Sequence, residues 1–389
     1  MINMKIRNSW FFKTIFIPFA ITRSILFFVG LMANYILPSN IYQTEETIKS
    51  GWLFSGHRII DMWARWDSGW YLSIIKIGYS MGKDVYTSSN LPFFPVYPYL
   101  VKIFTFLVPI RPLTDEIIIA VGLVLSNLML LGALVLIYKI SIYLFKSETV
   151  AKSAVWYLLV FPSSFFLSSF YTESTFLFFS LLSFWAATKR KWWLACTMAA
   201  VVSATRSIGL ILVLPLLAEY FHSKDYNLRK IDFSILWFAV VPLGILSFFY
   251  YMQTLTGDFF AAVKVQEAWG RKISDPFTSL LFPSGFWLYL TPLDQFFAVS
   301  SLIVSFTMMR DKLKVLNSLG LYSILLIVPT LFTSTLDSIS RYIVVIFPLF
   351  IYWAFLVKES ERFDLIAKIV FMSLQVIFFA MFSQFYWVG

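Results

Sequence analysis

WARWDSGWYLSIIKIGYS (63–80), followed after a polar gap by LPFFPVYPYL (91–100), is the stretch of sequence that decides how the fold of this chain is interpreted. It places an acid, Asp67, inside an otherwise apolar chain. Four aromatic side chains flank this acid: Trp63, Trp66, Trp70 and Tyr71. An ionised carboxylate beside a bilayer is costly unless it is paired or has a function. The central question is therefore what Asp67 does.

The composition around this stretch indicates a membrane protein. Hydrophobic residues make up 59% of the 389 residues and charged residues 13%, and the mean hydropathy is +0.77. Soluble domains carry about 25% charged residues. Apolar runs of about 20 residues, long enough to cross a bilayer, recur along the whole chain. A barrel would show short alternating segments instead, so we predict an all-α polytopic membrane protein.

Several classes of site are excluded by the residues present. The single cysteine, Cys196, allows no disulfide framework and no cysteine-based metal site. The chain has no Walker loop and no GxGxxG motif. The net charge of +10 does not indicate nucleic acid, because the basic residues lie between apolar runs, where membrane topology explains them. His57 and Asp61 alone are a thin basis for a metal, so we predict no cofactor and leave a divalent metal requirement open.

Eleven membrane spans are predicted, and the basic residues give them an orientation. The spans are 12–37, 116–141, 152–171, 173–188, 192–206, 208–222, 233–256, 291–309, 314–333, 340–357 and 365–387. With the N-terminus inside, each of six inner segments holds three basic residues, as the positive-inside rule expects. These are Lys5, Arg7, Lys13; Lys139, Lys146, Lys152; Lys189, Arg190, Lys191; Lys224, Arg229, Lys230; Arg310, Lys312, Lys314; and Lys358, Arg362, Lys368. The exception, Arg23, lies within the first span.

This layout requires residues 93–110 to lie along the outer surface, because a crossing there would invert every later loop. Three prolines (Pro92, Pro95 and Pro98) and the mid-run Lys102 suit an interfacial element. We therefore predict one domain, 1–389, with a catalytic outer loop at 38–115. A second outer loop, 257–290, is predicted to bind donor or acceptor.

Asp67 is the first candidate site residue. On a continuous helix, Trp63, Asp67, Trp70 and Tyr71 would share one face, whereas Arg65 would point elsewhere. Trp66, Trp70 and Tyr71 are then predicted to bind substrate, since aromatic faces stack on sugar rings. A partly desolvated carboxylate can take a proton from a hydroxyl group. The alternative is an interfacial aromatic belt beside a solvated acid.

Glu173 is the second candidate acid, in FPSSFFLSSFYTESTF (161–176). One interpretation is structural: Thr172 caps the following helix and Glu173 occupies its first turn. The other places Glu173 in the same outer cleft as Asp67, with Tyr171 among the substrate-binding residues.

Arginines are the candidate phosphate ligands. Arg206 lies in SATRSIGL (203–210), where Gly209 breaks the helix, and Arg341 lies in LDSISRYIVVIFP (336–348). Arg206 is either a ligand or a snorkelling helix end, and Asp337 is placed to pair with Arg341. The loop KVQEAWGRK (264–272) adds a basic and aromatic set, or a solvated loop near lipid headgroups: Lys264, Gln266, Trp269, Arg271 and Lys272.

Acids and cations on the outer side suggest transfer from a lipid-linked phosphosugar, because nucleotide sugars are generally absent there. RWDSGWYLSIIKIGY (65–79) with LPFFPVYPYL (91–100) resembles the signature of the PIG-V-type mannosyltransferases. Further blocks are similar and occur in the same order: FPSSFFLSSFYTES (161–174), ATRSIGL (204–210), VQEAWGR (265–271) and SRYIVVIFP (340–348).

The resemblance implies a GT-C fold, a polyprenyl-phosphate sugar donor and Asp67 as the catalytic aspartate, a general base, of the first outer loop. It implies inversion at the anomeric carbon by a single displacement onto a lipid or glycan acceptor. The compact chain is similar to bacterial members, which implies a bacterial cell membrane with the site facing outward. Glu173 would assist, and Arg206, Arg271 and Arg341 would bind the donor phosphate.

Two other classes of function remain. A lipid-linked glycan flippase would also need many spans and buried charges, but its charges should lie near the bilayer midplane, often within an internal repeat. Here the acids cluster at one predicted surface, and no repeat is evident. The last alternative is a non-catalytic scaffold of a glycosylation complex.

Overall fold

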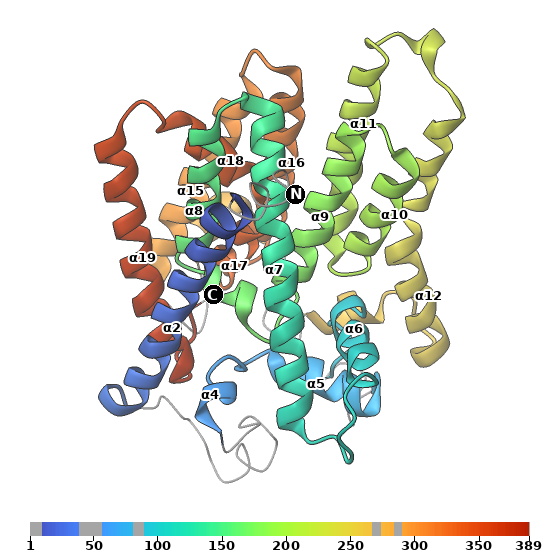
Figure 1. Ribbon diagram of the computed structural model, residues 1–389. Helices are drawn as coiled ribbons and strands as arrows, with labels where there is room; N and C mark the ends of the chain where they lie inside the picture. Colours follow the sequence, from blue (N-terminus) through green and yellow to red (C-terminus); the bar gives the residue numbers. More distant parts are fainter. Residues whose placement is uncertain (1–9, 39–56, 81–88, 267–273, 284–289, 389) are drawn as a thin grey trace, which may run out of the picture. The chain divides into compact units, whose positions relative to one another are not determined.

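The computed structural model describes residues 10–38, 57–80, 89–266, 274–283 and 290–388, and these ranges contain helices and no extended strand (Figure 1). The chain forms two compact units: unit 1 (residues 1–72, 101–174 and 350–389) and unit 2 (residues 73–100 and 175–349). The unit boundaries fall inside helices: α5 (Ser68–Ile77), α6 (Val96–Thr105), α9 (Glu173–Thr188) and α18 (Phe347–Leu356).

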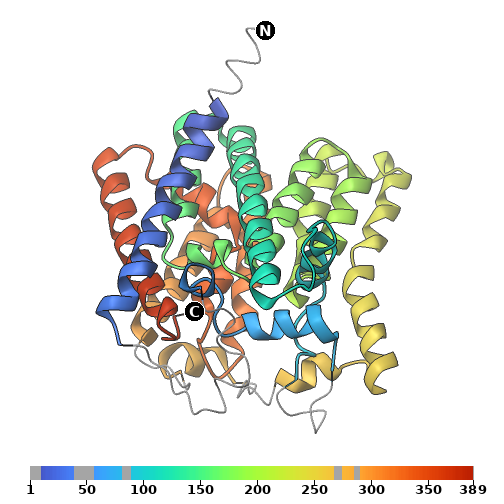
Figure 2. The same cartoon turned by 60° about the horizontal axis from the view of Figure 1, so that its bottom comes forward.

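Unit 1 holds three helices long and apolar enough to cross a membrane: η1–α2 (Phe12–Phe16 and Ile17–Ile36), α7 (Asp115–Phe145) and α19 (Glu361–Ser383). Helices α2 and α19 pack side by side (Figure 2). The shorter elements of this unit are α4 (Arg58–Asp61), α8 (Glu148–Val160) and η2 (Ser164–Ser168).

Local sequence signals set the start of α7. The Thr114 hydroxyl accepts a hydrogen bond from the amide of Ile117, and Asp115 and Glu116 occupy the first turn. A capping hydroxyl and early acids satisfy the free amides and the positive end of the helix dipole. Its 31 residues therefore begin at a defined point and extend about 46 Å at about 1.5 Å per residue.

The segment after α8 departs from the predicted span 152–171. Helix α8 ends at Val160, two residues before Pro162, because proline lacks an amide donor and disfavours a helical residue before it. The chain continues as η2, and all residues from 161 to 172 are buried. Burial inside protein is what allows irregular backbone in a membrane domain.

Arg23 of α2 supports this irregular segment. It is 8% exposed, and its guanidinium donates to the hydroxyl of Ser164 (2.9 Å) and to the carbonyl of Ser164 (3.3 Å). Arg23, which lies well inside the first predicted span, therefore has a structural partner just beyond α8.

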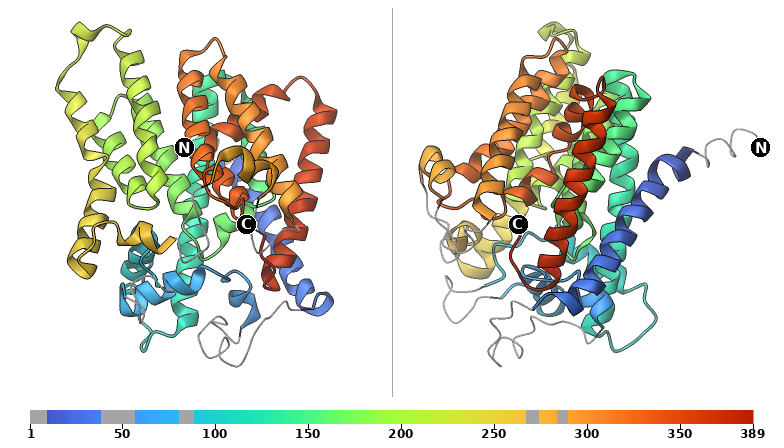
Figure 3. Two further views of the ribbon diagram at one scale, coloured as in Figure 1. Left: turned by 180° about the vertical axis from the view of Figure 1, so that it is seen from behind. Right: turned by 90° about the vertical axis from the view of Figure 1, so that its left-hand side faces the viewer.

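Unit 2 holds three further helices of membrane-spanning length: η5–α12 (Phe233–Val240 and Leu243–Thr256), α15 (Thr291–Met309) and α16 (Lys314–Leu331). Helices α15 and α16 lie side by side (Figure 3). The shorter elements are α10 (Trp192–Ser203), η3 (Ser207–Leu212), α11 (Val213–Ser223), η4 (Leu228–Lys230), α13 (Ala261–Lys264), α14 (Pro276–Leu281) and α17 (Ile339–Val344).

These helices confirm the all-α polytopic architecture. Six predicted spans correspond to the six long helices, whereas those predicted at 152–171, 173–188, 192–206, 208–222 and 340–357 are shorter or interrupted in the structure. The segment 93–110, predicted not to cross, contains the ten-residue helix α6. Ten residues are about half of what a helix needs to span a bilayer.

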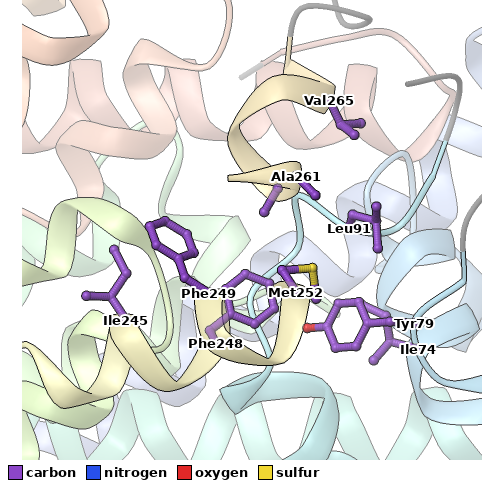
Figure 4. Packing of buried hydrophobic residues seen from close by; sticks show 10 residues of the cluster. Ile74, Tyr79, Leu91, Ile245, Phe248, Phe249, Met252, Ala261 and Val265 are labelled. Carbon is purple, nitrogen blue, oxygen red and sulfur yellow. The ribbon is translucent and has the colours of Figure 1, made fainter. Parts of the chain in front are cut away.

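The connection between α2 and α7 is anchored in unit 2 by an apolar cluster. Ile74, Tyr79 and Leu91 pack against one end of α12 and against α13 (Figure 4). The Tyr79 hydroxyl also donates to the carbonyl of Phe93 at 2.6 Å. Residues 74–79 and 91–93 of this connection are therefore held in place by buried contacts.

Candidate active site

Asp67 lies at the start of α5 in unit 1. Its carbonyl accepts the amide of Trp70 at 3.0 Å, and the residue is half-buried. A carboxylate at a helix N-terminus is stabilised by the free amides and the dipole of that helix. The arrangement gives a half-buried acid on a backbone that hydrogen bonds hold.

The predicted shared helical face is wrong for Trp63. Helix α4 ends at Asp61 and α5 begins at Ser68, so Trp63 and Asp67 do not lie on one helix. The ring of Trp63 instead packs on Phe379 of α19, with ring centroids 4.4 Å apart. Trp70 and Tyr71 do lie in the first turn of α5, half-buried and buried respectively.

Trp66 has a left-handed backbone, with φ of 52°. Bulky residues rarely adopt this conformation, so surrounding contacts must hold it. The indole of Trp66 meets that of Trp387 edge to face, with centroids 5.2 Å apart. The residue immediately before Asp67 is thus fixed from the segment that follows α19.

The connection between α8 and α9 holds the other side of the loop between α4 and α5 (residues 62–67, the Asp67 loop). The Phe170 amide donates to the carbonyl of Trp63 (3.1 Å), and the Ser68 hydroxyl donates to the carbonyl of Phe170 (3.2 Å). Tyr171 is fully buried, and its hydroxyl donates to the carbonyl of Arg65 (2.7 Å). Its ring lies 6.2 Å from that of Tyr71. Two blocks far apart in the sequence therefore form one structural unit around Asp67.

Glu173 is the first residue of α9 and is fully buried. It occupies the first helical turn as predicted, but Thr172 does not cap the helix, since its hydroxyl makes no hydrogen bond within the described residues. The buried hydroxyl of Ser174 has no such bond there either. A carboxylate flanked by buried hydroxyls is a suitable environment for a hydroxyl-bearing ligand.

Two of the predicted phosphate ligands belong to unit 2. The guanidinium of Arg206 lies over the ring of Tyr342, 4.8 Å from its centroid, and Arg341 of α17 is 3% exposed. Arg206 follows the end of α10 in an extended conformation. A Cβ at Gly209 would lie 2.3 Å from the Val202 carbonyl oxygen, so only glycine fits there. The structure thus brings the ATRSIGL and SRYIVVIFP blocks together.

The segment 264–272 is only partly described. Lys264 forms an ion pair with Asp258 at 2.5 Å, and this contact lowers the pKa of the Asp258 carboxyl. Lys264 is therefore already partnered within unit 2. Gln266 is half-buried, two residues after the end of α13. Trp269 and Arg271 lie outside the described residues.

Sequence reasoning assigned no role to Arg65 and considered Asp61 only beside His57. In the structure Arg65 is 3% exposed and bonds to the Asp61 carboxylate at 2.5 Å. Opposite charges four residues apart were the available signal, because such pairs meet on a helix; in the structure the pair forms although α4 ends at Asp61. Within the described ranges no three His, Cys, Asp or Glu residues are grouped to hold a metal ion.

Solved membrane enzymes share this fold. ArnT from Cupriavidus metallidurans bound to undecaprenyl phosphate matches at 17% identity and a TM-score of 0.52, over 85% of this chain and 62% of that one. The apo oligosaccharyltransferase of Archaeoglobus fulgidus matches at 14% identity and a TM-score of 0.54, over 95% and 56% respectively. The chain thus spans less than two thirds of the length of either enzyme. Both are GT-C glycosyltransferases.

No functionally curated protein matches the chain at a significant level. The profile of one family does match: mannosyltransferase (PIG-V), over residues 22–256. That range covers more than half of the chain and includes Asp67, Tyr171, Glu173 and Arg206.

Proposed function

The chain belongs to the PIG-V family of mannosyltransferases, and on that premise we propose that it is an inverting glycosyltransferase that moves mannose from a polyprenyl-phosphate donor to a hydroxyl of a lipid or glycan acceptor. The observation that carries this proposal is the half-buried Asp67, presented at the start of α5 on a loop that buried contacts hold in place. A fixed, accessible carboxylate beside aromatic rings is what a general base for a sugar acceptor requires.

Asp67 accepts the proton of the acceptor hydroxyl while the oxygen of that hydroxyl attacks the anomeric carbon of the donor sugar. The bond between that carbon and the phosphate oxygen breaks, and its electron pair leaves on the polyprenyl phosphate. One displacement inverts the anomeric configuration. Glu173 helps to hold the acceptor, and Trp66, Trp70 and Tyr71 provide the aromatic surface for the sugar. Tyr171 supports them, since its hydroxyl is already donated to Arg65.

The departing phosphate needs cations, because negative charge develops on it in the transition state. Arg206, Arg341 and Arg271 are the proposed ligands. Arg206 and Tyr342 already meet, so the two blocks that carry Arg206 and Arg341 lie together in unit 2. The likeness to ArnT, whose solved structure holds undecaprenyl phosphate, supports a donor of this class.

The location of the reaction is also a proposal. Three basic residues in each of the six segments predicted to face inward support a topology in which Asp67 faces away from the cytoplasm. We place the enzyme in a bacterial cell membrane with its site outward. No partner subunit, cofactor or nucleic acid is part of this proposal.

The test is sugar transfer by Asp67→Asn and Asp67→Ala. Purified protein is incubated with radiolabelled polyprenyl-phosphate mannose and a membrane extract, and the labelled product is identified. Both substitutions should lower turnover by about 10²- to 10⁴-fold, the usual contribution of a general base. Asp225→Asn, which removes an exposed ion pair with Lys230, is the matched control. Wild-type turnover in both Asp67 variants would refute the assignment. If the unsubstituted protein binds the donor but transfers no sugar, a flippase or a scaffold is favoured instead.

A further inference from the structure

We propose that Arg65 is a positioning residue for Asp67, and that it acts by joining the Asp67 loop to the last residue of α19 and the segment that follows it (residues 383–388). This inference rests on the proposed role of Asp67 as general base. The observation that supports it is that Arg65 is buried and donates mainly to backbone carbonyls of two segments far apart in the sequence.

Arg65 uses its whole guanidinium. Its Nη1 donates to the carboxylate and carbonyl of Asp61 and to the carbonyl of Ala64 (2.8 Å). Its Nε (3.2 Å) and Nη2 (3.1 Å) both donate to the carbonyl of Ser383, at the end of α19. Its carbon Cζ lies 4.2 Å from the centroid of the Phe385 ring. The side chain is thus held on all sides.

Only arginine can make this set of contacts. A planar guanidinium presents five N–H donors in a fixed fork and stacks on an aromatic face, whereas a lysine ammonium is a compact charge on a flexible stem. Burial lowers the pKa of the Arg65 guanidinium, and the Asp61 carboxylate opposes that shift. Asp61 therefore helps to keep the buried fork charged and oriented.

The contacts of Arg65 affect Asp67 through the backbone of Arg65 itself and of Trp66, the residue between them. The main chain of Arg65 is held by the Tyr171 hydroxyl (2.7 Å) while its side chain is held by Ser383. Trp66, the next residue, has its left-handed backbone and packs on Trp387. The loop is consequently fixed on one side by residues 170–171 and on the other by residues 383–387. Both sides belong to unit 1.

Stability alone does not explain a buried ion pair of this kind. Replacing such a pair by apolar residues of similar volume is often neutral or stabilising, because both charges must be desolvated. A misplacement of about 1 Å in a catalytic group, in contrast, can lower the rate by about 10²-fold. The Asp61–Arg65 pair is therefore better explained by the geometry that it gives to the backbone leading to Asp67.

The experiment separates positioning from stability with the double variant Asp61→Leu/Arg65→Met. We expect it to remain folded, with a melting temperature a few degrees lower because the carbonyls of Ala64 and Ser383 lose their donor. Its kcat should fall by about 10²-fold, while its KM for polyprenyl-phosphate mannose changes less than about twofold. Arg65→Lys should leave kcat equally low, since lysine keeps the charge but not the fork.

The matched control is Asp364→Leu/Lys368→Met, which removes another ion pair of the same spacing in unit 1 (2.5 Å). It should leave kcat unchanged. Wild-type kcat in the Asp61/Arg65 double variant would overturn the proposal. If that variant does not fold, Trp387→Leu takes its place. We expect its kcat to fall by about 10²-fold at unchanged KM, and a wild-type kcat would overturn the proposal.

The two proposals fail differently. If Asp67→Asn turns over at the wild-type rate, the proposed function of Asp67 is wrong whatever Arg65 does. If Asp67→Asn is inactive while the double variant has wild-type kcat, only the positioning role is wrong.

Discussion

The hydroxyl of Tyr171 donates a hydrogen bond of 2.7 Å to the carbonyl oxygen of Arg65, 106 residues earlier in the chain. The same carbonyl accepts the amide of Ser68 at 3.1 Å. This one oxygen atom therefore links the block FYTES to the block RWDSGW.

Tyr171→Phe removes this donor and keeps the ring. A buried hydrogen bond contributes about 1 kcal/mol, so the melting temperature should fall by about 2 to 4 °C. We expect kcat to fall by up to about tenfold, the equivalent of about 1.4 kcal/mol, with little change in donor KM.

Tyr157→Phe is its control, because the Tyr157 hydroxyl donates to the Asp364 carboxylate (2.8 Å), away from the Asp67 loop. Melting curves and initial rates of both variants decide the matter. Equal kcat losses in the two would show that only general stability is involved.

Arg206→Ala should weaken binding of the polyprenyl-phosphate donor. Loss of a hydrogen bond to a charged group costs about 1.5–3 kcal/mol, which corresponds to an increase of about 10- to 150-fold in Kd. Binding of polyprenyl phosphate, measured by competition with the labelled donor, checks this. Arg310→Ala is the comparison, since the Arg310 guanidinium also lies over a ring of unit 2, that of Phe306 (5.1 Å). If both variants bind the donor equally, Arg206 is not a phosphate ligand.

Gly244→Ala tests the packing of α12 on α10. A Cβ at position 244 would lie 1.9 Å from the Ala200 carbonyl oxygen and 2.4 Å from the Ser203 hydroxyl. Such overpacking costs about 1–3 kcal/mol or more, so a large fall in melting temperature is expected.

Gly257→Ala, at the other end of α12, separates packing from backbone conformation. Gly257 has a φ of +76° and no atom within 4 Å of its would-be Cβ, so alanine there meets only the cost of a left-handed residue, about 1–2 kcal/mol. Thermal size-exclusion profiles should show the larger shift for Gly244→Ala. The reverse order would contradict the close contact.

The long helices were predictable because their signal is local. In α7, for example, an apolar run, two early acids and a capping threonine all lie within the segment itself. The end of α8 was not recovered although Pro162 marks it, because the apolar run continues past the proline. Hydropathy records burial, and residues 161–172 are buried in protein as irregular backbone.

Asp67 and Glu173 stand out in the sequence because acids are rare in apolar surroundings. Their supporting contacts were not predictable, since they are long-range: Arg65 meets Ser383, and Tyr171 meets Arg65. Most of these bonds also end on backbone carbonyls, which every residue has. A pattern of side-chain types therefore carries no trace of them.

The left-handed backbone of Trp66 has a consequence for the temperature dependence of the reaction. A loop held in a rarely populated conformation has few alternatives to explore, so the ordering of the neighbouring carboxylate is completed during folding rather than at each turnover. Trp66→Gly would release this restriction, because glycine adopts positive φ freely but equally adopts many other conformations. The change should appear mainly as a more unfavourable activation entropy.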